Sequence, residues 1–133
     1  MRTKRLILLL IAFTFSACLI AQSQNDEFWD AARNNNIKTL KELLDKGIDV
    51  NVKTHYGTTA LTFAAYRGNL EAVNILLEKG ADPNIKDAFY GATPFTMSLY
   101  KGNIEILKAM VNHGADLSSG EELVAAVDQR LKE

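Results

Sequence analysis

The sequence predicts an all-α repeat solenoid of helix pairs with short hairpin fingers, with about three repeats and a C-terminal capping helix. Two observations support this fold class. The segment 69–82, Asn-Leu-Glu-Ala-Val-Asn-Ile-Leu-Leu-Glu-Lys-Gly-Ala-Asp, returns in related form at 103–116. In addition, Gly80 follows Gly47 by 33 residues and Gly114 follows Gly80 by 34 residues. Helix pairs repeated at this spacing bury their apolar faces by stacking on one another.

Residues 1–21 are interpreted as a secretory signal peptide and are excluded from the fold. Arg2, Lys4 and Arg5 precede an apolar run at 6–15, and small and then polar residues follow that run. This order is typical of secretory leaders. A stable membrane span needs roughly 20 apolar residues, so the run is too short. We therefore expect export, to a bacterial periplasm or out of the cell.

The mature N-terminus has more than one candidate. Cleavage after Ala21 or after Ser23 places a small residue beside the cut. Alternatively, the segment Phe-Ser-Ala-Cys ending at Cys18 resembles a bacterial lipobox, in which the cysteine is acylated and becomes the first residue. Phe15 stands where leucine is usual in that motif. Cleavage at Ala21 or later would leave no cysteine, and then no disulfide could stabilise the domain.

Charge and composition exclude some classes of partner. Removal of residues 1–21 leaves 12 Lys and Arg against 16 Asp and Glu, a net charge of −4. Affinity for nucleic acid comes largely from excess positive charge. We therefore expect no nucleic-acid partner, and no membrane contact unless Cys18 is lipidated.

Helix ends within the repeats are marked by residues that favour them. Thr59 and Thr93 carry hydroxyls that can accept hydrogen bonds from the amides of a helix start. Pro94 suits the first helical position. Glycines occupy the positions after helices, where a left-handed conformation is common; these are Gly68, Gly80, Gly102 and Gly114.

The second helix of each repeat carries an apolar stripe at i, i+3, i+6 and i+7, which we expect to pack against neighbouring repeats. The stripes are Ile37, Leu40, Leu43 and Leu44, then Leu70, Val73, Leu76 and Leu77, then Ile104, Leu107, Met110 and Val111.

Residues 54–86 resemble an ankyrin repeat along their whole length. The residues that match the family pattern are Gly57, Thr59, Leu61, Ala64, Ala65, Gly68, Val73, Leu76, Leu77, Gly80, Ala81 and Asp82. The resemblance implies a degenerate N-terminal capping repeat at 25–53 with Asp26 at its helix cap, repeats at 54–86 and 87–117, and a capping helix at 118–133. The family's helix-start histidine is replaced by Trp29, Thr62 and Thr96, so we expect a weaker network between repeats.

No catalytic, cofactor or metal site can be assembled from this sequence. His55 and His113 fall at distant positions of the repeat, and a metal site needs three or four ligands with defined spacing. The helix carboxylates lie on polar faces rather than in two unlike environments beside a cleft. No glycine-rich phosphate loop follows a strand. We therefore expect no enzyme activity and no cofactor.

Variable positions of the first helices and fingers are the candidate binding residues. In a stack, residues at equivalent positions of neighbouring repeats lie side by side and form rows. Phe63 therefore lies beside Met97, and Tyr66 beside Tyr100. The resemblance implies that these rows form a concave, partner-binding face. The candidates are Arg33, His55, Phe63, Tyr66, Arg67, Phe89, Met97, Tyr100 and Lys101.

Alternative roles stay open for the tyrosines. Tyr66 and Tyr100 could pack between repeats with their hydroxyls in water, and Tyr56 and Tyr90, each directly before a turn glycine, could be structural. The expected function is a monomeric, exported module that binds another protein with an acidic or mixed surface. The alternative is a lipid-anchored accessory or protective protein for a periplasmic enzyme.

Overall fold

The computed structural model describes residues 2–89 and 91–118. The helices are α1 (Arg2–Arg33), α2 (Ile37–Asp45), α3 (Ala60–Arg67), α4 (Leu70–Glu78), α5 (Pro94–Lys101) and α6 (Ile104–Asn112). The described residues contain no strand, so the all-α repeat fold is confirmed and the fingers are loops. The expected capping helix lies outside the described residues, apart from Ser118.

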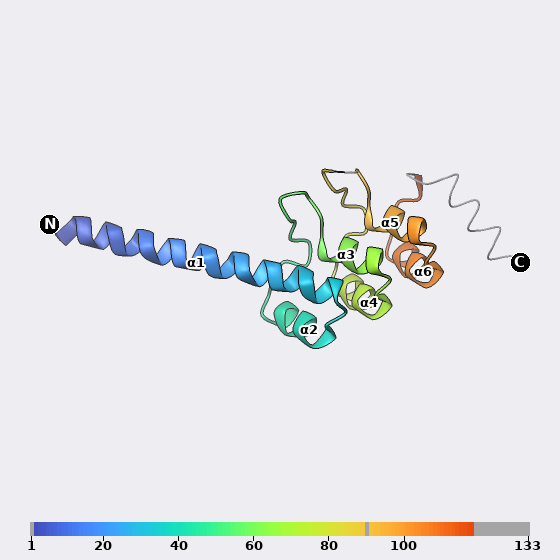
Figure 1. Ribbon diagram of the computed structural model, residues 1–133, viewed down its shortest axis with the longest axis horizontal. Helices are drawn as coiled ribbons and strands as arrows, with labels where there is room; N and C mark the ends of the chain where they lie inside the picture. Colours follow the sequence, from blue (N-terminus) through green and yellow to red (C-terminus); the bar gives the residue numbers. More distant parts are fainter. Residues whose placement is uncertain (1, 90, 119–133) are drawn as a thin grey trace, which may run out of the picture.

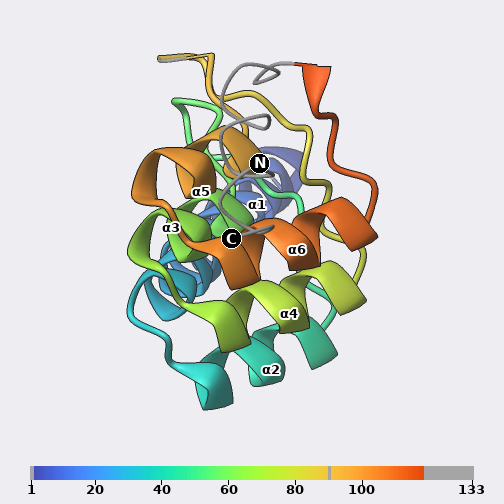
Figure 2. The same cartoon turned by 90° about the vertical axis from the view of Figure 1, so that its right-hand side faces the viewer.

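The helices form two layers. Figure 2 shows α1, α3 and α5 in one layer and α2, α4 and α6 in the other. Neighbours pack within each layer, and each helix packs on its partner in the other layer, as α3 does on α4. The loops that precede α3 and α5 project from the same side of the stack (Figure 1). The central pair, α3 and α4, is therefore covered on both sides.

The helix boundaries confirm the roles predicted for threonine, proline and glycine. Thr59 Oγ1 accepts from the Thr62 amide at 3.3 Å at the start of α3. At the start of α5, Thr93 and Thr96 form a reciprocal capping box, with proline at the first helical position. The helix α3 ends at Gly68, whose φ of +76° is left-handed. Local hydrogen bonding therefore begins and ends α3 and α5.

Equivalent positions of the three pairs supply the core. Phe28, Leu61 and Phe95 occupy the same position of α1, α3 and α5, and each is at most 2% exposed. Leu40, Val73 and Leu107 occupy equivalent positions in the outer layer, and each is at most 4% exposed. Because each of these side chains contacts a neighbouring pair, the core is continuous along the stack.

The apolar stripe predicted for the second helix of each repeat does not coincide with the face of that helix that is buried in the structure. Leu70 and Val111 are 36% and 44% exposed, whereas Ala72 and Ile106 are fully buried. The inner helix lies on one side of α4 and two outer helices flank it, so its buried face includes Ala72 and turns Leu70 towards solvent. The prediction was right for Val73, Leu76 and Leu77 and wrong for Leu70 and Val111.

The first helix is continuous with the leader. Asp26 was expected at a helix cap, but α1 runs unbroken from Arg2 to Arg33 and Asp26 lies inside it. The segment holds no glycine or proline that would end a helix. Only Phe28, Ala31 and Ala32 of α1 are buried. Among the described residues, α1 is long and apolar enough to cross a membrane, a test that signal sequences also pass.

Asparagine side chains join successive repeats outside the core. Asn51 Nδ2 donates to the Gly80 carbonyl at 3.4 Å, and Asn51 Oδ1 accepts from the Asp82 amide at 2.8 Å. The same pair of bonds recurs one repeat later in Asn84, Gly114 and Asp116, at 3.0 and 2.6 Å. Each asparagine therefore joins the loop after one outer helix to the equivalent loop of the next repeat.

The carboxylates of the same loops accept hydrogen bonds from amides two residues on. Asp116 Oδ1 accepts from the Ser118 amide at 2.9 Å, and this bond holds the pKa of the exposed carboxyl below its ordinary value. Ser118 stands where Asn51 and Asn84 stand in the earlier repeats. Serine therefore replaces, at this position, the asparagine that joins neighbouring loops in the earlier repeats.

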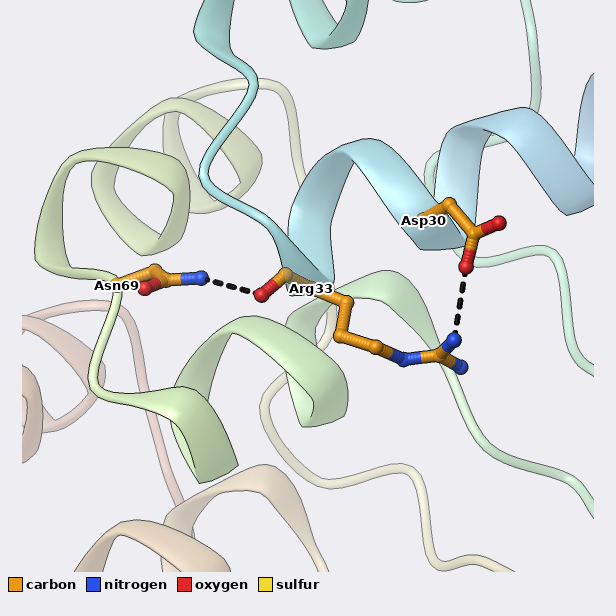
Figure 3. A network of polar contacts seen from close by, with 3 residues as sticks. All are labelled: Asp30, Arg33 and Asn69. Atoms are coloured by element: carbon orange, nitrogen blue, oxygen red, sulfur yellow. Dashed lines mark hydrogen bonds and ion pairs between the residues drawn. The ribbon is translucent and has the colours of Figure 1, made fainter.

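Further contacts between repeats start from the last turns of α1. Asn69 Nδ2 donates to the carbonyl oxygens of Ala32 and Arg33, both at 2.9 Å. Figure 3 shows the bond to Arg33. These carbonyls have no partner within the helix. Trp29 Nε1 donates to the Val52 carbonyl at 3.1 Å and so holds the loop after α2. Thr62 and Thr96 bond only locally. Asn51, Asn69 and Asn84 make polar contacts between repeats, whereas Trp29 bonds Val52 within the first repeat.

Alanine substitutions in α4 should distinguish a buried residue of the predicted apolar stripe from an exposed one by their effect on stability. Leu76→Ala removes a fully buried side chain of the central pair and should lower the free energy of unfolding by about 2–4 kcal/mol. Leu70→Ala, in the same helix but 36% exposed, should cost about 1 kcal/mol or less. Urea unfolding followed by circular dichroism measures both. Equal losses would contradict the burial pattern.

Candidate functional site

Two fingers precede the inner helices α3 and α5. The first finger (54–58) is closed by a bond from the Thr54 amide to the Thr58 carbonyl at 2.9 Å. The second finger (87–92), in which Tyr90 is not described, is closed from the Asp87 amide to the Ala92 carbonyl at 2.9 Å. The second closure spans one more residue because this repeat carries an insertion.

The fingers contact each other directly. The Ala88 amide donates to the Tyr56 carbonyl at 2.7 Å. The rings of Tyr56 and Phe89 meet edge to face, with centroids 6.3 Å apart. Gly57 has a φ of +78°, and a Cβ at this position would lie only 3.1 Å from the Ala88 nitrogen. A side chain at 57 would therefore push the two fingers apart.

A pocket of about 820 Å³ lies between the fingers and the inner helices. We call it the aromatic pocket; its lining residues are Tyr56, Thr58, Thr62, Phe63, Tyr66, Asp87, Phe89, Ala92, Thr96, Met97 and Tyr100. Pockets of this size can enclose a ligand or a group of side chains. Phe89 and Tyr100 are 70% and 79% exposed, so the pocket is open to solvent on this side.

The pocket unites most of the predicted binding residues. Phe63, Tyr66, Phe89, Met97 and Tyr100 all line it. Tyr66 and Tyr100 are largely exposed rather than enclosed between repeats. Each tyrosine therefore presents its ring to a space that a partner can enter.

Two predicted cations lie on aromatic rings at the edge of the pocket. The Arg33 guanidinium carbon is 4.3 Å from the centroid of the Phe63 ring, and Lys101 Nζ is 4.3 Å from that of Tyr66. Arg33 Nη1 also bonds Asp30 Oδ1 at 2.7 Å (Figure 3). These contacts hold the cations beside the pocket.

The remaining predicted residues lie outside the pocket lining. The His55 ring contacts the adjacent Tyr56 ring at a tilt of 46°, with ring centroids 3.5 Å apart. Arg67 is exposed at the end of α3. Cys18 is exposed on α1.

A comparison with family models decides the classification. A model described as ankyrin repeats matches residues 28–121 in three copies. The chain belongs to the ankyrin-repeat family. Ankyrin repeats generally mediate contacts between proteins. A search of curated proteins found no match to this chain.

The ankyrin register explains the pocket residues that the sequence prediction missed. Six residues line the pocket but were not candidates: Tyr56, Thr58, Thr62, Asp87, Ala92 and Thr96. Thr58 is equivalent to Ala92, and Thr62 to Thr96, one repeat apart. Thr62 and Thr96 stand in the position of the family's histidine, and this substitution was the available signal.

Three polar side chains of the pocket form hydrogen bonds within the fold. Thr62 and Thr96 bond their capping threonines, and Asp87 Oδ1 accepts from the Phe89 amide at 3.0 Å. Among the described residues, no group of three or more His, Cys, Asp or Glu side chains could hold a metal ion. The exposed ring faces and Met97 are what the ankyrin pocket offers to a ligand, so the arrangement suits binding of apolar groups.

Two glycine substitutions can measure the contact between the fingers. Gly47 and Gly57 both have positive φ, so alanine at either should cost about 1–2 kcal/mol. No atom approaches a Cβ at Gly47, whereas one at Gly57 meets the Ala88 amide. Gly57→Ala should therefore destabilise by about 1 kcal/mol more, because the bond from Ala88 to Tyr56 is strained. Thermal unfolding and exchange of the Ala88 amide proton test this, and identical behaviour of the variants would refute it.

Proposed function

We propose that this ankyrin stack is an exported, non-catalytic module that binds a partner protein across the aromatic pocket. The face consists of α3, α5 and the two fingers. The observation that carries the proposal is the gathering of exposed aromatic side chains around an open pocket. Exposed apolar patches rimmed by polar groups are typical of interaction sites.

The residue types support a protein partner. Tyrosine and arginine are enriched among the side chains that dominate binding energy at protein interfaces. Tyr66 and Tyr100 have rigid rings, so they lose little conformational entropy when a partner covers them. The bond between the fingers and the ring contacts of Arg33 and Lys101 order this face before binding, which lowers the entropic cost of association.

Export is the second part of the proposal. The basic and apolar start of α1 is compatible with a signal sequence or an anchor. Cleavage after Ala21 or Ser23 would leave the buried Phe28, Ala31 and Ala32 in the mature domain. The alternative is acylation at Cys18, which is exposed on the helix and would make the protein a lipid-anchored accessory or protective protein for a periplasmic enzyme.

The double variant Tyr66→Ala, Tyr100→Ala tests the binding face. The two side chains are 46% and 79% exposed, so helix content and melting temperature should stay unchanged. Affinity for the native partner, captured from the protein's own cells, should fall by about ten-fold or more for each tyrosine. Surface plasmon resonance against the captured partner measures the loss.

The matched control removes exposed apolar side chains from the outer layer. Leu70→Ala with Val111→Ala alters residues that are 36% and 44% exposed on α4 and α6. This variant should capture the partner as the unmodified protein does. Unaltered capture by the tyrosine variant would refute the assignment of the face.

Mass spectrometry of the protein from its own cells tests processing. Signal-peptide cleavage should give a mature chain that begins at Gln22 or Gln24, without a lipid. A mass increase that corresponds to a diacylglyceryl group on Cys18 would establish the lipid-anchored alternative instead. An intact leader in the isolated protein would contradict both forms of processing.

A further inference from the structure

The elements around the aromatic pocket carry little negative charge. The helices α2, α4 and α6 carry five acidic residues, Glu42, Asp45, Glu71, Glu78 and Glu105, and three lysines, Lys38, Lys41 and Lys108. In contrast, α3, α5 and the two fingers contain the cations Arg67 and Lys101 and a single acidic residue, Asp87, which is 6% exposed. The formal net charge is therefore −2 for the three outer helices and +1 for α3, α5 and the fingers.

Positive charges follow the edge of the pocket. Each inner helix ends in a cation, Arg33 in α1, Arg67 in α3 and Lys101 in α5. Arg33 pairs with Asp30. Within the described part of the chain, Arg67 and Lys101 make no ion pair, and both are exposed. A positive terminal residue is favourable at a helix C-terminus, and this row also leaves two cations beside the pocket for an incoming anion.

The contacts of Arg33 and Lys101 with aromatic rings further restrict which chemical groups can bind in the pocket. Lys101 covers one face of the Tyr66 ring, and Arg33 covers one face of the Phe63 ring. A cationic group that approached the Phe63 or Tyr66 ring would meet a cation already in place and would be repelled by it. An apolar group would contact the open ring edges and Met97, and a nearby carboxylate would meet Lys101 and Arg67.

We propose that the aromatic pocket takes an apolar side chain from a partner protein segment in which that side chain is flanked by Asp or Glu. The carboxylates bind Lys101 and Arg67 while the apolar anchor lies between the fingers and α3 and α5. This inference rests on the proposed function and adds the kind of segment that the partner presents.

Two synthetic peptides provide the test. Both contain the core Phe-Leu; one has glutamates on either side and the other has lysines. Fluorescence anisotropy with the protein isolated from its own cells should show about ten-fold tighter binding of the glutamate peptide. The preference should shrink at 1 M salt, where the screening length is only about 3 Å.

Charge-reversal variants test which residue causes the preference for the glutamate peptide. Lys101→Glu should abolish or reverse this preference. The control Lys108→Glu makes the same change of charge on α6, where Lys108 lies 3.8 Å from Glu105, and should leave the preference intact. Tyr100→Ala should weaken both peptides alike because it removes part of the apolar contact. Both lysines and Tyr100 are exposed, so circular dichroism should show folded protein in each case.

Each outcome bears on the inference. Equal affinity for the two peptides would contradict the inference that Asp or Glu flanks the bound side chain. Failure of both peptides to bind would contradict the inference that the pocket takes an apolar side chain. Binding that is unaffected by Tyr100→Ala places the peptide elsewhere and also overturns the inference. The proposed function is judged separately, by the tyrosine double variant and the native partner, so it can survive failure of the peptides.

Discussion

Burial of apolar side chains between neighbouring helix pairs is the interaction on which the whole molecule depends. Leu61, Val73 and Leu76 of the central pair are almost completely buried because helices of the pairs before and after it cover them. A helix pair alone would expose these side chains to water, and stacking removes that cost. Ala64 and Ala65 of α3 are fully buried as well, so small side chains also belong to this core.

The same register creates the candidate site. Because Leu61 and Phe95 lie at equivalent positions of one continuous core, the outward positions of α3 and α5 also align. Phe63 and Met97 then share one wall of the pocket, and Tyr66 and Tyr100 share another. The fingers line a further side of the pocket, and the bond from the Ala88 amide to the Tyr56 carbonyl joins them. The binding face therefore needs no core of its own.

Polar contacts divide their roles by position. Asn51 and Asn84 join the loops after the outer helices, and Asn69 satisfies carbonyls at the end of α1. These asparagines lie apart from the aromatic pocket, so they stabilise the stack without using the surface that a partner would cover. The ankyrin histidine position, occupied here by Thr62 and Thr96, faces the pocket instead. The small threonines leave space between the fingers and the helices.

The sequence by itself determined the repeat, the helix caps and the inner core, because these depend on local hydrogen bonding and on a spacing visible in the chain. The sequence also identified five of the eleven residues that line the pocket, including Tyr66 and Tyr100. Tertiary structure decided three things that spacing cannot show. In the structure, α1 continues through Asp26, the buried face of α4 leaves Leu70 exposed, and Asn69 contacts the preceding repeat. Burial and long-range hydrogen bonds depend on which elements lie on either side of a residue, and only the assembled stack contains that information.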